Sequence, residues 1–358
     1  MTGIRGIAAV WVMLYHAQLG AGRYYNLPFL QKVPDLGSGW RGVDLFFMLS
    51  GFILMYAHER DFQVIRKANL IRFARLRFVR VYPLNAVVLL LIAAFVAFQP
   101  GFVAWMRVFD PSNFSFGAFV RTLLLATRWF LHGRGDWNQP TWSLSLEVLG
   151  YAIFPFVAYF VTRVARIWQL IAMAFLSLLT SLVFLELKGR SITIEQIAVV
   201  RMLACFLAGV AVFRIWTLTA ESAQKRWAAW ISAVAAVGIL VAGLSPKGGF
   251  AFNYLFAFLL YGLAFQRGIV NKLLSTRIAV FLGNISFPLY LTHVVPILWL
   301  HYFLLLNGAR YTTFEKSAAL MCWAIGCVLM ATLLHHFVEV PSHELGRRWA
   351  GARVPNQT

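Results

Sequence analysis

The chain has 358 residues, of which 60% are hydrophobic, 16% aromatic and 13% charged, and its mean hydropathy is +0.71. This composition excludes a soluble globular protein, because long apolar runs recur from one end of the chain to the other. The net charge of +19 comes from Lys and Arg residues that gather in short segments between those runs, which is typical of membrane topology and argues against nucleic acid as a partner. We therefore expect an all-α polytopic integral membrane protein, a helical bundle with a single domain over residues 1–358 and no appended soluble domain.

The apolar runs, in chain order, are residues 4–21, 42–58, 83–98, 117–131, 142–162, 168–186, 196–216, 227–243, 250–266, 279–304 and 316–338. The basic clusters between and beyond them are residues 66–80, 163–166, 225–226, 267–277 and 347–353. If all eleven runs crossed the membrane, these clusters would lie on both of its faces, contrary to the positive-inside rule. The run 117–131 is short and contains Arg121 and Arg128, so we expect a re-entrant or interfacial helix there. Ten transmembrane helices then remain, with both termini in the cytoplasm and a large outer loop from Gln99 to Thr141.

The first run carries two ionisable side chains, Arg5 and His16. Eleven residues make three helical turns plus roughly 20°, so both side chains share one helix face and lie about 16 Å apart along the axis. Ionisable groups in a membrane helix cost about 2.5 kcal/mol or more, and they persist mostly where they line a functional cavity. We expect Arg5 and His16 to line one internal path; the alternative is that each is only hydrogen-bonded to a neighbouring helix.

Glu147 is the candidate partner of His16. It lies about five residues inside the outer end of its run, and His16 lies about twelve residues from the cytoplasmic end of the first run, so both reach the outer half of the membrane. A carboxylate beside a neutral imidazole orients the ring and stabilises the imidazolium that forms when the ring takes a proton. We therefore predict His16 and Glu147 as the catalytic residues.

A second group of candidates lies on the cytoplasmic side, where four arginines within nine residues precede Tyr82 and Pro83. They are Arg72, Arg75, Arg77 and Arg80. Guanidinium groups hold phosphate and pyrophosphate by paired hydrogen bonds, so the cluster suits a polyanionic ligand, with Arg5 available on the same face. A plain topology anchor would have the same composition.

Six motifs follow one another along the chain. They are Met1-Thr-Gly-Ile-Arg-Gly-Ile-Ala-Ala with His16, Gly42-Val-Asp-Leu-Phe-Phe-Met-Leu-Ser-Gly51, the run from Arg72 to Pro83, Thr141-Trp-Ser-Leu-Ser-Leu-Glu147, Leu282-Gly-Asn-Ile-Ser-Phe-Pro-Leu-Tyr-Leu-Thr-His293 and Phe337-Val-Glu-Val-Pro341. Together they resemble the membrane acyltransferase-3 family of bacterial O-acyltransferases. The resemblance implies ten spans and transfer of an acyl group, commonly acetyl from cytoplasmic acetyl-CoA, to hydroxyls of surface glycans on the far side of the membrane.

The resemblance also implies roles for single residues. His16 stands where the family has its first-helix histidine, the candidate base or acyl relay, Arg5 where it has the paired arginine, and Glu147 at the glutamate of the Trp-Ser-Leu motif. Arg77 and Arg80 match the basic motif before Tyr82, which places the two arginines on the coenzyme phosphates and Tyr82 beside the coenzyme.

This sequence departs from the family pattern at two positions. Leu76 stands where a further arginine is common, so that Arg72 or Arg75 would have to replace it on the phosphates. Val148 stands where a second acid is frequent, so that Glu147 alone carries any carboxylate role.

Further polar residues are weaker candidates. Asp44 could bind a sugar hydroxyl or only neutralise Arg41, and Trp142 could stack on a sugar ring or only mark the membrane interface. The residues Ser286, Tyr290 and His293, spaced four and three, share a helix face and either line the acyl-donor channel or only bond neighbouring helices. Because the spacing of His335, His336, Glu339 and His343 is weak evidence for a metal site, we expect no metal.

The sequence thus predicts a membrane O-acyltransferase in a bacterial inner membrane that moves an acyl group, most simply acetyl, from acyl-CoA to a glycan or lipid-linked sugar. His16 either deprotonates the acceptor hydroxyl for direct attack or carries the acyl group transiently. The rival from another class is a transporter or flippase whose buried His, Glu and Arg relay protons. A second rival is an acyltransferase that acts on a lipid or a protein.

Overall fold

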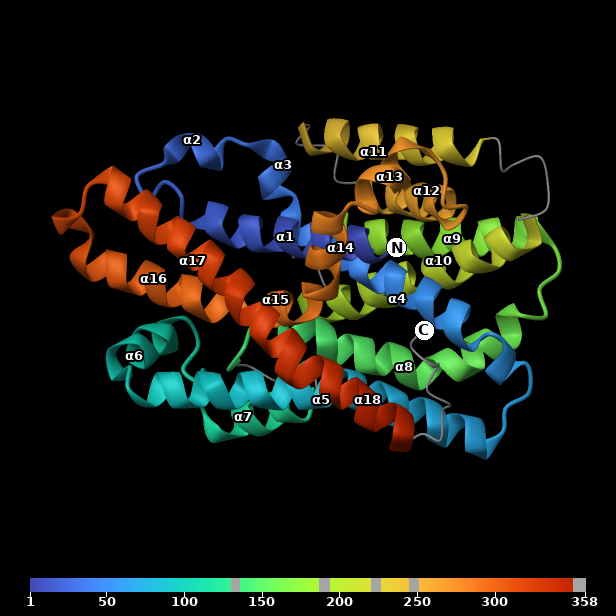
Figure 1. Cartoon of the computed structure of the whole chain (residues 1–358), viewed down its shortest axis with the longest axis horizontal. Coiled ribbons are helices and arrows are strands. Elements are labelled where there is room, and N and C mark those ends of the chain that lie inside the picture. Colours follow the sequence, from blue (N-terminus) through green and yellow to red (C-terminus); the bar gives the residue numbers. More distant parts are fainter. Residues whose placement is uncertain (130–135, 187–193, 220–226, 245–250, 350–358) are drawn as a thin grey trace. The chain divides into compact units, whose positions relative to one another are not determined.

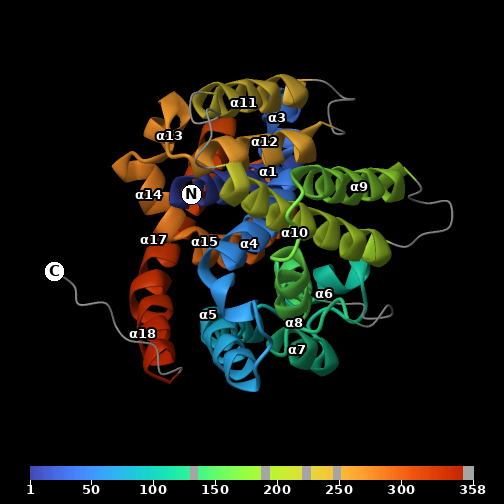
Figure 2. The ribbon, with the colours of Figure 1, turned by 90° about the vertical axis from the view of Figure 1, so that its right-hand side faces the viewer.

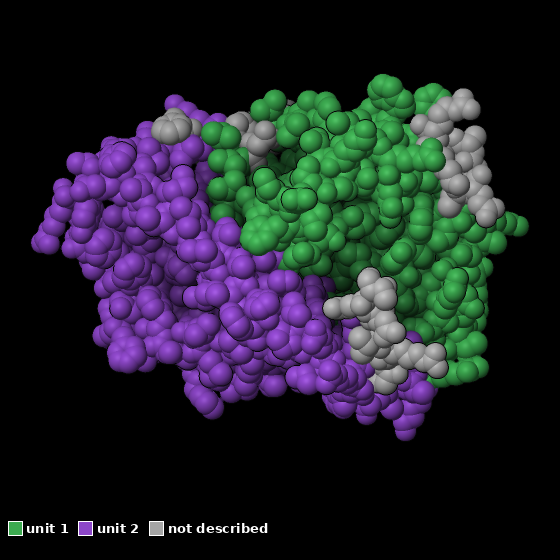
Figure 3. Space-filling model, in the orientation of Figure 1, with its two compact units in different colours: residues 1–15, 33–66, 149–284 green, residues 16–32, 67–148, 285–358 purple. Residues whose placement is uncertain are grey.

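The computed structural model describes residues 1–129, 136–186, 194–219, 227–244 and 251–349, and within these ranges it contains helices and turns but no strand (Figure 1). Contacts divide the chain into two compact units, each assembled from three stretches. Unit 1 comprises residues 1–15, 33–66 and 149–284, and unit 2 comprises residues 16–32, 67–148 and 285–358 (Figure 3). The predicted all-α class is confirmed for the described residues, whereas Lys225, Arg226 and Arg353 of the basic clusters lie outside them.

Unit 1 is built around one buried helix, α10. Its helices are most of α1 (Thr2–Leu19), α3 (Pro34–Gly37), η1 (Gly39–Arg41), α4 (Gly42–His58), η2 (Arg60–Phe62), α8 (Thr141–Val161) from residue 149 onward, α9 (Ile167–Glu186), α10 (Ile194–Thr219), α11 (Ala228–Leu244), α12 (Phe252–Ala264), α13 (Gly268–Leu274) and α14 (Arg277–Asn284). Helices α4 and α9 both pack along α10, and α11 packs along α12 (Figure 2). The apolar window of α10 is 67% buried and that of α9 only 22% buried, so α10 forms the core and α9 presents most of its surface outward.

Helices α4 and α10 approach each other closely because each places a glycine at the contact. A Cβ atom on Gly209 would lie 1.9 Å from the carbonyl oxygen of Met48, and a Cβ on Gly51 would lie 2.1 Å from the carbonyl oxygen of Phe206. Both obstacles are backbone atoms of the partner helix, which cannot rotate away. Such small-residue contacts let the backbones of membrane helices meet.

Gly209→Ala should therefore destabilise the protein, because the added methyl group forces the two helices apart. Overpacking of this kind costs about 1–3 kcal/mol or more, and the measurement is the midpoint of thermal unfolding in detergent. The matched control is Gly326→Ala in α17, where an added Cβ meets no atom within 4 Å and where alanine should be favoured by about 0.5–1 kcal/mol. Equal midpoints for the two variants would contradict the close packing of α4 on α10.

Unit 2 is organised around a long helix and a long C-terminal helical run. Its helices are the end of α1, α2 (Pro28–Gln31), α5 (Lys67–Ala97), α6 (Pro100–Phe109), α7 (Phe116–Leu123), the start of α8, α15 (Ser286–Thr292), α16 (Val294–Asn307), η5 (Gly308–Arg310), α17 (Thr313–Leu334), the π-helical turn η6 (His335–Glu339) and α18 (Val340–Trp349). Helix α18 packs on α5 and α15 packs on α17, while α7 also packs on α5 (Figure 1).

Helix α5 is longer than the apolar run predicted for this part of the chain. The run begins at residue 83, but the helix begins at Lys67 and continues through Pro83 for 31 residues. This length corresponds to about 46 Å, which exceeds the roughly 30 Å hydrocarbon core of a bilayer. The basic segment is therefore the first half of a continuous helix that extends beyond the core, and not a separate loop.

Each of the ten runs expected to cross the membrane coincides with helix in the structure, although residues 279–304 are divided among α14, α15 and α16. Among the residues that the structure describes, seven helices are long and apolar enough to span a bilayer, and α11 and α12 are shorter apolar helices. The chain is a multi-pass helical membrane protein, while the number of ten spans stays a prediction. Helix α7 has only eight residues and ends at Leu123, so it is too short to cross.

Candidate active site

The predicted catalytic histidine, His16, lies in the last turn of α1 and makes a polar contact with a second histidine. Its Nδ1 atom lies 3.2 Å from Nε2 of His293. The two rings meet edge to face, with centroids 4.9 Å apart and planes at 69°. His16 is half-buried and His293 is fully buried, so one ring of the pair remains accessible while the other is enclosed.

His293 stands at the junction between two helices, as the C-cap of α15 and the N-cap of α16. Its Nδ1 atom lies 3.2 Å from the carbonyl oxygen of Leu289, one helical turn earlier. From α17, the indole Nε1 of Trp323 donates a hydrogen bond to the carbonyl oxygen of His293 at 3.2 Å. Ring and backbone of His293 are therefore each held by a separate contact.

The start of α8 is tied to the same junction. The side-chain amide of Asn138 donates to the carbonyl oxygen of Leu291 at 2.9 Å, and the hydroxyl groups of Ser143 and Tyr290 are hydrogen-bonded at 2.7 Å. Glu147 follows Ser143 by four residues, so it lies on the same face of α8, one turn further along. It is half-buried, and its contact with His16 stays a prediction.

The predicted stripe on α15 faces the interior of unit 2. Ser286, Tyr290 and His293 are all nearly or fully buried, at 1%, 6% and 0% exposure. The rings of Tyr290 and His293 have centroids 5.9 Å apart. The stripe thus connects α8 to the histidine pair by way of Tyr290, and any role as lining of a donor channel stays a prediction.

A third histidine, which the sequence did not single out, lies two turns along α16 from His293. His301 is 6% exposed and its ring stacks on Tyr24, with centroids 4.5 Å apart and planes at 13°. Among the described residues its Nε2 has no hydrogen-bond partner. In the sequence, His301 could have been noticed as the second histidine of the apolar run 279–304, eight residues after His293. This spacing does not reveal which neighbouring helix His301 faces.

The four arginines of α5 do not share one ligand-facing surface. At about 100° per residue they spread over roughly 200° of the helix circumference. The guanidinium group of Arg75 donates to the carbonyl oxygen of Trp349 at 3.2 Å and lies 5.0 Å from the centre of its ring. Arg77 lies 5.5 Å from the ring of Phe73. Arg75 thus has a partner in α18, and its place on coenzyme phosphates stays a prediction.

Arg80 is held by a buried carboxylate that the sequence placed in a possible metal set. It forms an ion pair with Glu339, which is 3% exposed, and it lies 5.3 Å from the ring centre of Phe287. Glu339 also accepts a hydrogen bond from Nδ1 of His335 at 2.7 Å, and His343 lies 3.2 Å from the guanidinium group. These contacts make the cluster an ion-pair network.

Tyr82, predicted beside the coenzyme, contacts the residue that ends α7. Its hydroxyl group donates to the carbonyl oxygen of Leu124 at 3.3 Å, and its ring stacks on Phe78 with centroids 4.7 Å apart. In the segment just before α8, burial raises the pKa of Asp136, while its ion partner Arg128 at 3.3 Å opposes that rise. Trp142, the candidate for sugar stacking, is the second residue of α8 and half-buried.

Asp44, predicted to bind a sugar hydroxyl, is fully buried in unit 1 and paired with two arginines. Its Oδ1 accepts from Nη2 of Arg201 at 2.7 Å and from Nε of the same residue at 3.2 Å, and its Oδ2 lies 3.6 Å from Arg41. Both guanidinium groups also cover the ring of Trp40, at 4.1 and 4.6 Å. This arrangement agrees with the alternative in which Asp44 neutralises Arg41.

Arg5 belongs to unit 1 as well and is half-buried.

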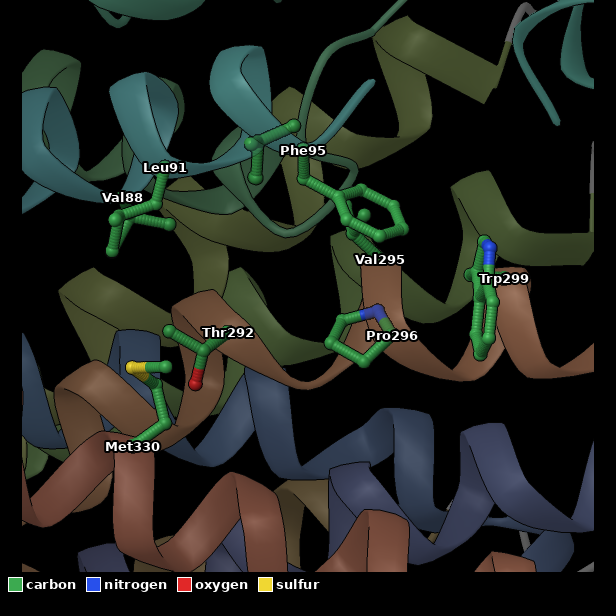
Figure 4. A pocket seen from close by; sticks show the side chains of 9 residues that line it. Val88, Leu91, Phe95, Thr292, Val295, Pro296, Trp299 and Met330 are labelled. Carbon is green, nitrogen blue, oxygen red and sulfur yellow. The ribbon is translucent and has the colours of Figure 1, made fainter. Parts of the chain in front are cut away.

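An apolar cavity of about 240 Å³ lies beside the histidine-bearing junction of unit 2 (Figure 4). Val88, Leu91 and Phe95 of α5 face it from one side, and side chains from the α15–α16 junction face it from the other, with Met330 from α17. Such an apolar lining suits a hydrocarbon chain and has no charged group that could bind a phosphate. The cavity is therefore separate from any phosphate-binding part of the site.

Comparisons with known proteins agree with the motifs. The family model described as an acyltransferase domain, Acyl_transf_3, matches residues 1–334. The acyltransferase MdmB of Streptomyces mycarofaciens is 27% identical over 386 aligned positions, which cover 99% of this chain and 94% of that protein. Protein 2 in the picA locus of Rhizobium radiobacter is 29% identical over 43% of this chain and 78% of its own length.

The O-acetyltransferase OatA of Staphylococcus aureus is 22% identical over 51% of this chain, but the match covers only 28% of that longer protein. No solved structure matches this chain significantly. The family match decides between the two classes of function raised by the sequence, in favour of an enzyme over a transporter. The chain belongs to the acyltransferase-3 family and is a membrane acyltransferase.

Proposed function

We propose that this protein is an O-acyltransferase that moves an acyl group, most simply acetyl, from acyl-CoA on the cytoplasmic side to a hydroxyl of a glycan or lipid-linked sugar on the other side of a bacterial inner membrane. The observation that carries the proposal is the His16–His293 contact, in which a half-buried imidazole is held in a fixed orientation by an enclosed one. A positioned imidazole is the group that commonly takes a proton from a hydroxyl in acyl transfer.

The roles proposed for the other residues follow from their placement. His16 is the general base or the transient acyl carrier, and Glu147 stabilises the imidazolium from the start of α8, which Ser143 ties to α15. Direct transfer requires donor and acceptor to be bound together, whereas an acyl carrier gives ping-pong kinetics. Both routes use the same imidazole.

The donor is proposed to be acetyl-CoA, bound from the basic half of α5. Arg75 and Arg80 are engaged by the C-terminal run and Arg77 lies over the ring of Phe73, so a bound coenzyme would compete with contacts inside the protein. Guanidinium groups suited to phosphate are present on this half of the helix, and the basic motif before Tyr82 makes Arg77 the first of them to test. No metal is needed for this chemistry.

Arg77→Ala is expected to raise KM for acetyl-CoA by about tenfold or more, since a charge-assisted hydrogen bond contributes about 1.5–3 kcal/mol, while kcat changes little. Initial rates over a range of acetyl-CoA concentrations measure both constants. Arg163→Ala is the control, because it removes the same charge from another part of the protein. The Arg163 side chain donates to carbonyl oxygens of Tyr159 and Gln63 in unit 1. A KM that rises equally in both variants would indicate general surface charge and not a coenzyme contact.

The proposed location and topology rest on charge. The basic clusters share one face if ten helices cross, which places both termini in the cytoplasm. The acceptor class is supported by similarity to OatA, whose name describes an O-acetyltransferase, and a lipid or protein acceptor is the alternative.

Mass spectrometry of surface polysaccharide tests the acceptor, with cells that contain the protein compared with cells that lack it. We expect acetyl esters on sugar hydroxyls only where the protein is present. Esters found instead on extracted lipid or on protein would overturn the glycan assignment and leave the acyltransferase class intact.

A further inference from the structure

We propose that His293 is a positioning residue that holds His16 in one tautomer, with the proton on Nδ1 and the reactive lone pair on Nε2. The inference rests on the proposed catalytic role of His16 and adds which nitrogen reacts and why. It is carried by a chain of two contacts, from the Leu289 carbonyl oxygen through His293 to His16.

The first link is fixed by the chemistry of a carbonyl group. The oxygen of Leu289 can only accept a hydrogen bond, so Nδ1 of His293, 3.2 Å away, must carry the proton. A neutral imidazole carries one N–H, which leaves Nε2 of His293 as an acceptor. His293 is 0% exposed, and a charged ring at such a position would be costly. The neutral form is therefore the one that fits.

The second contact determines which ring nitrogen of His16 carries the proton. The acceptor Nε2 of His293 lies 3.2 Å from Nδ1 of His16, so Nδ1 of His16 must donate. Neutral His16 then has its lone pair on Nε2, the nitrogen that points away from His293. Serine hydrolases use an acceptor on Nδ1–H for the same purpose, and loss of the correct tautomer there lowers kcat about 10⁴-fold.

Hydrogen bonds from two other segments hold the backbone around His293, which fixes the position of its acceptor atom Nε2. Trp323 binds the carbonyl oxygen of His293 from α17, and Asn138 binds the carbonyl oxygen of Leu291. Leu289 itself is 0% exposed and lies within α15. The orientation of the His293 ring thus depends on α17 and on the segment that precedes α8.

In direct transfer the reaction balances through Nε2 of His16. This nitrogen takes the proton of the acceptor hydroxyl as the hydroxyl oxygen bonds to the thioester carbonyl carbon. The carbon–sulfur bond then breaks, and the thiolate of the coenzyme leaves with the proton returned by Nε2. The Nδ1–H bond to His293 stays intact and is strengthened while His16 is an imidazolium.

The kinetic test replaces His293 in two ways. His293→Gln keeps an acceptor oxygen near the place of Nε2, whereas His293→Phe keeps a ring but has no acceptor. We expect kcat to fall about 10²-fold or more in His293→Phe and less than tenfold in His293→Gln, with KM for acetyl-CoA little changed in both. A role limited to packing predicts the reverse order, because phenylalanine preserves the ring volume. The control is His336→Phe at an exposed histidine of η6, which should keep kcat within about threefold.

A second measurement needs no variant of His293. Nitrogen-15 NMR of the histidine-labelled full-length protein reports which ring nitrogen is protonated, and the His16 signals are identified by their loss in His16→Gln. The expected result is a protonated Nδ1 and a bare Nε2; a protonated Nε2 would overturn the inference. Full activity of His16→Gln would instead overturn the proposed function, so the two failures are distinguishable.

Discussion

Replacement of His16 by glutamine should lower kcat for acyl transfer by about 10²–10⁴-fold, the range that general base catalysis contributes. Glutamine has a similar size and can still hydrogen-bond to His293, so the loss would come from the missing basic nitrogen. Transfer of label from [¹⁴C]acetyl-CoA by purified protein measures the effect, and the KM for the donor should stay close to its original value. Glu147→Gln in the same assay tests the proposed carboxylate partner, for which we expect a smaller loss.

The matched control for His16→Gln is His336→Gln, which makes the same change at an exposed histidine of η6. It should have the activity of the original protein. Equal unfolding midpoints of the variants would show that the fold is intact. Wild-type kcat in His16→Gln would remove the central role assigned to this imidazole.

The second large effect is expected at Glu339, whose replacement by glutamine should destabilise the protein. The side chain is 2% exposed and pairs with Arg80, itself only 24% exposed. Removal of one partner from a buried ion pair costs about 3–5 kcal/mol, because the other charge is left uncompensated, and the partial exposure of Arg80 favours the lower end. Thermal unfolding in detergent measures the loss.

Glu344→Gln is the control for Glu339→Gln, since it removes an exposed carboxylate from the adjoining helix α18. Its free energy of unfolding should stay within about 0.5 kcal/mol of the original value. The double variant Arg80→Met with Glu339→Leu should regain part of the stability, because no buried charge is then unpaired. If Glu339→Gln unfolds at the original midpoint, the ion pair contributes nothing to the fold.

Hydropathy predicted where the helices of this chain lie but not where several of them begin. The apolar run at residue 83 marks the start of the hydrophobic part of α5, whereas the helix itself starts at Lys67. Arginine and lysine are good helix formers, so the helix continues where the apolar signal ends. The run 279–304 likewise conceals the breaks at Ile285 and His293, because both breaks are made of apolar or buried residues.

The sequence singled out individual residues of the candidate site but not the contacts between them. His16 and His293 were both candidates, but they were assigned to different roles, and 277 residues separate them in the chain. Helical periodicity tells which residues share one face of a helix, and not which other helix that face meets. For the same reason Arg80 and Glu339 were assigned to a phosphate site and a weak metal set, although the structure joins them as one ion pair.

The account is tested most directly by purified protein in lipid vesicles supplied with [¹⁴C]acetyl-CoA. We predict that the protein binds acetyl-CoA and releases its acetyl group, slowly to water when no acceptor is present and faster to a hydroxyl acceptor, with free coenzyme thiol formed in equal amount. Vesicles in which acetyl-CoA is neither bound nor cleaved, with or without acceptor, would contradict the assignment.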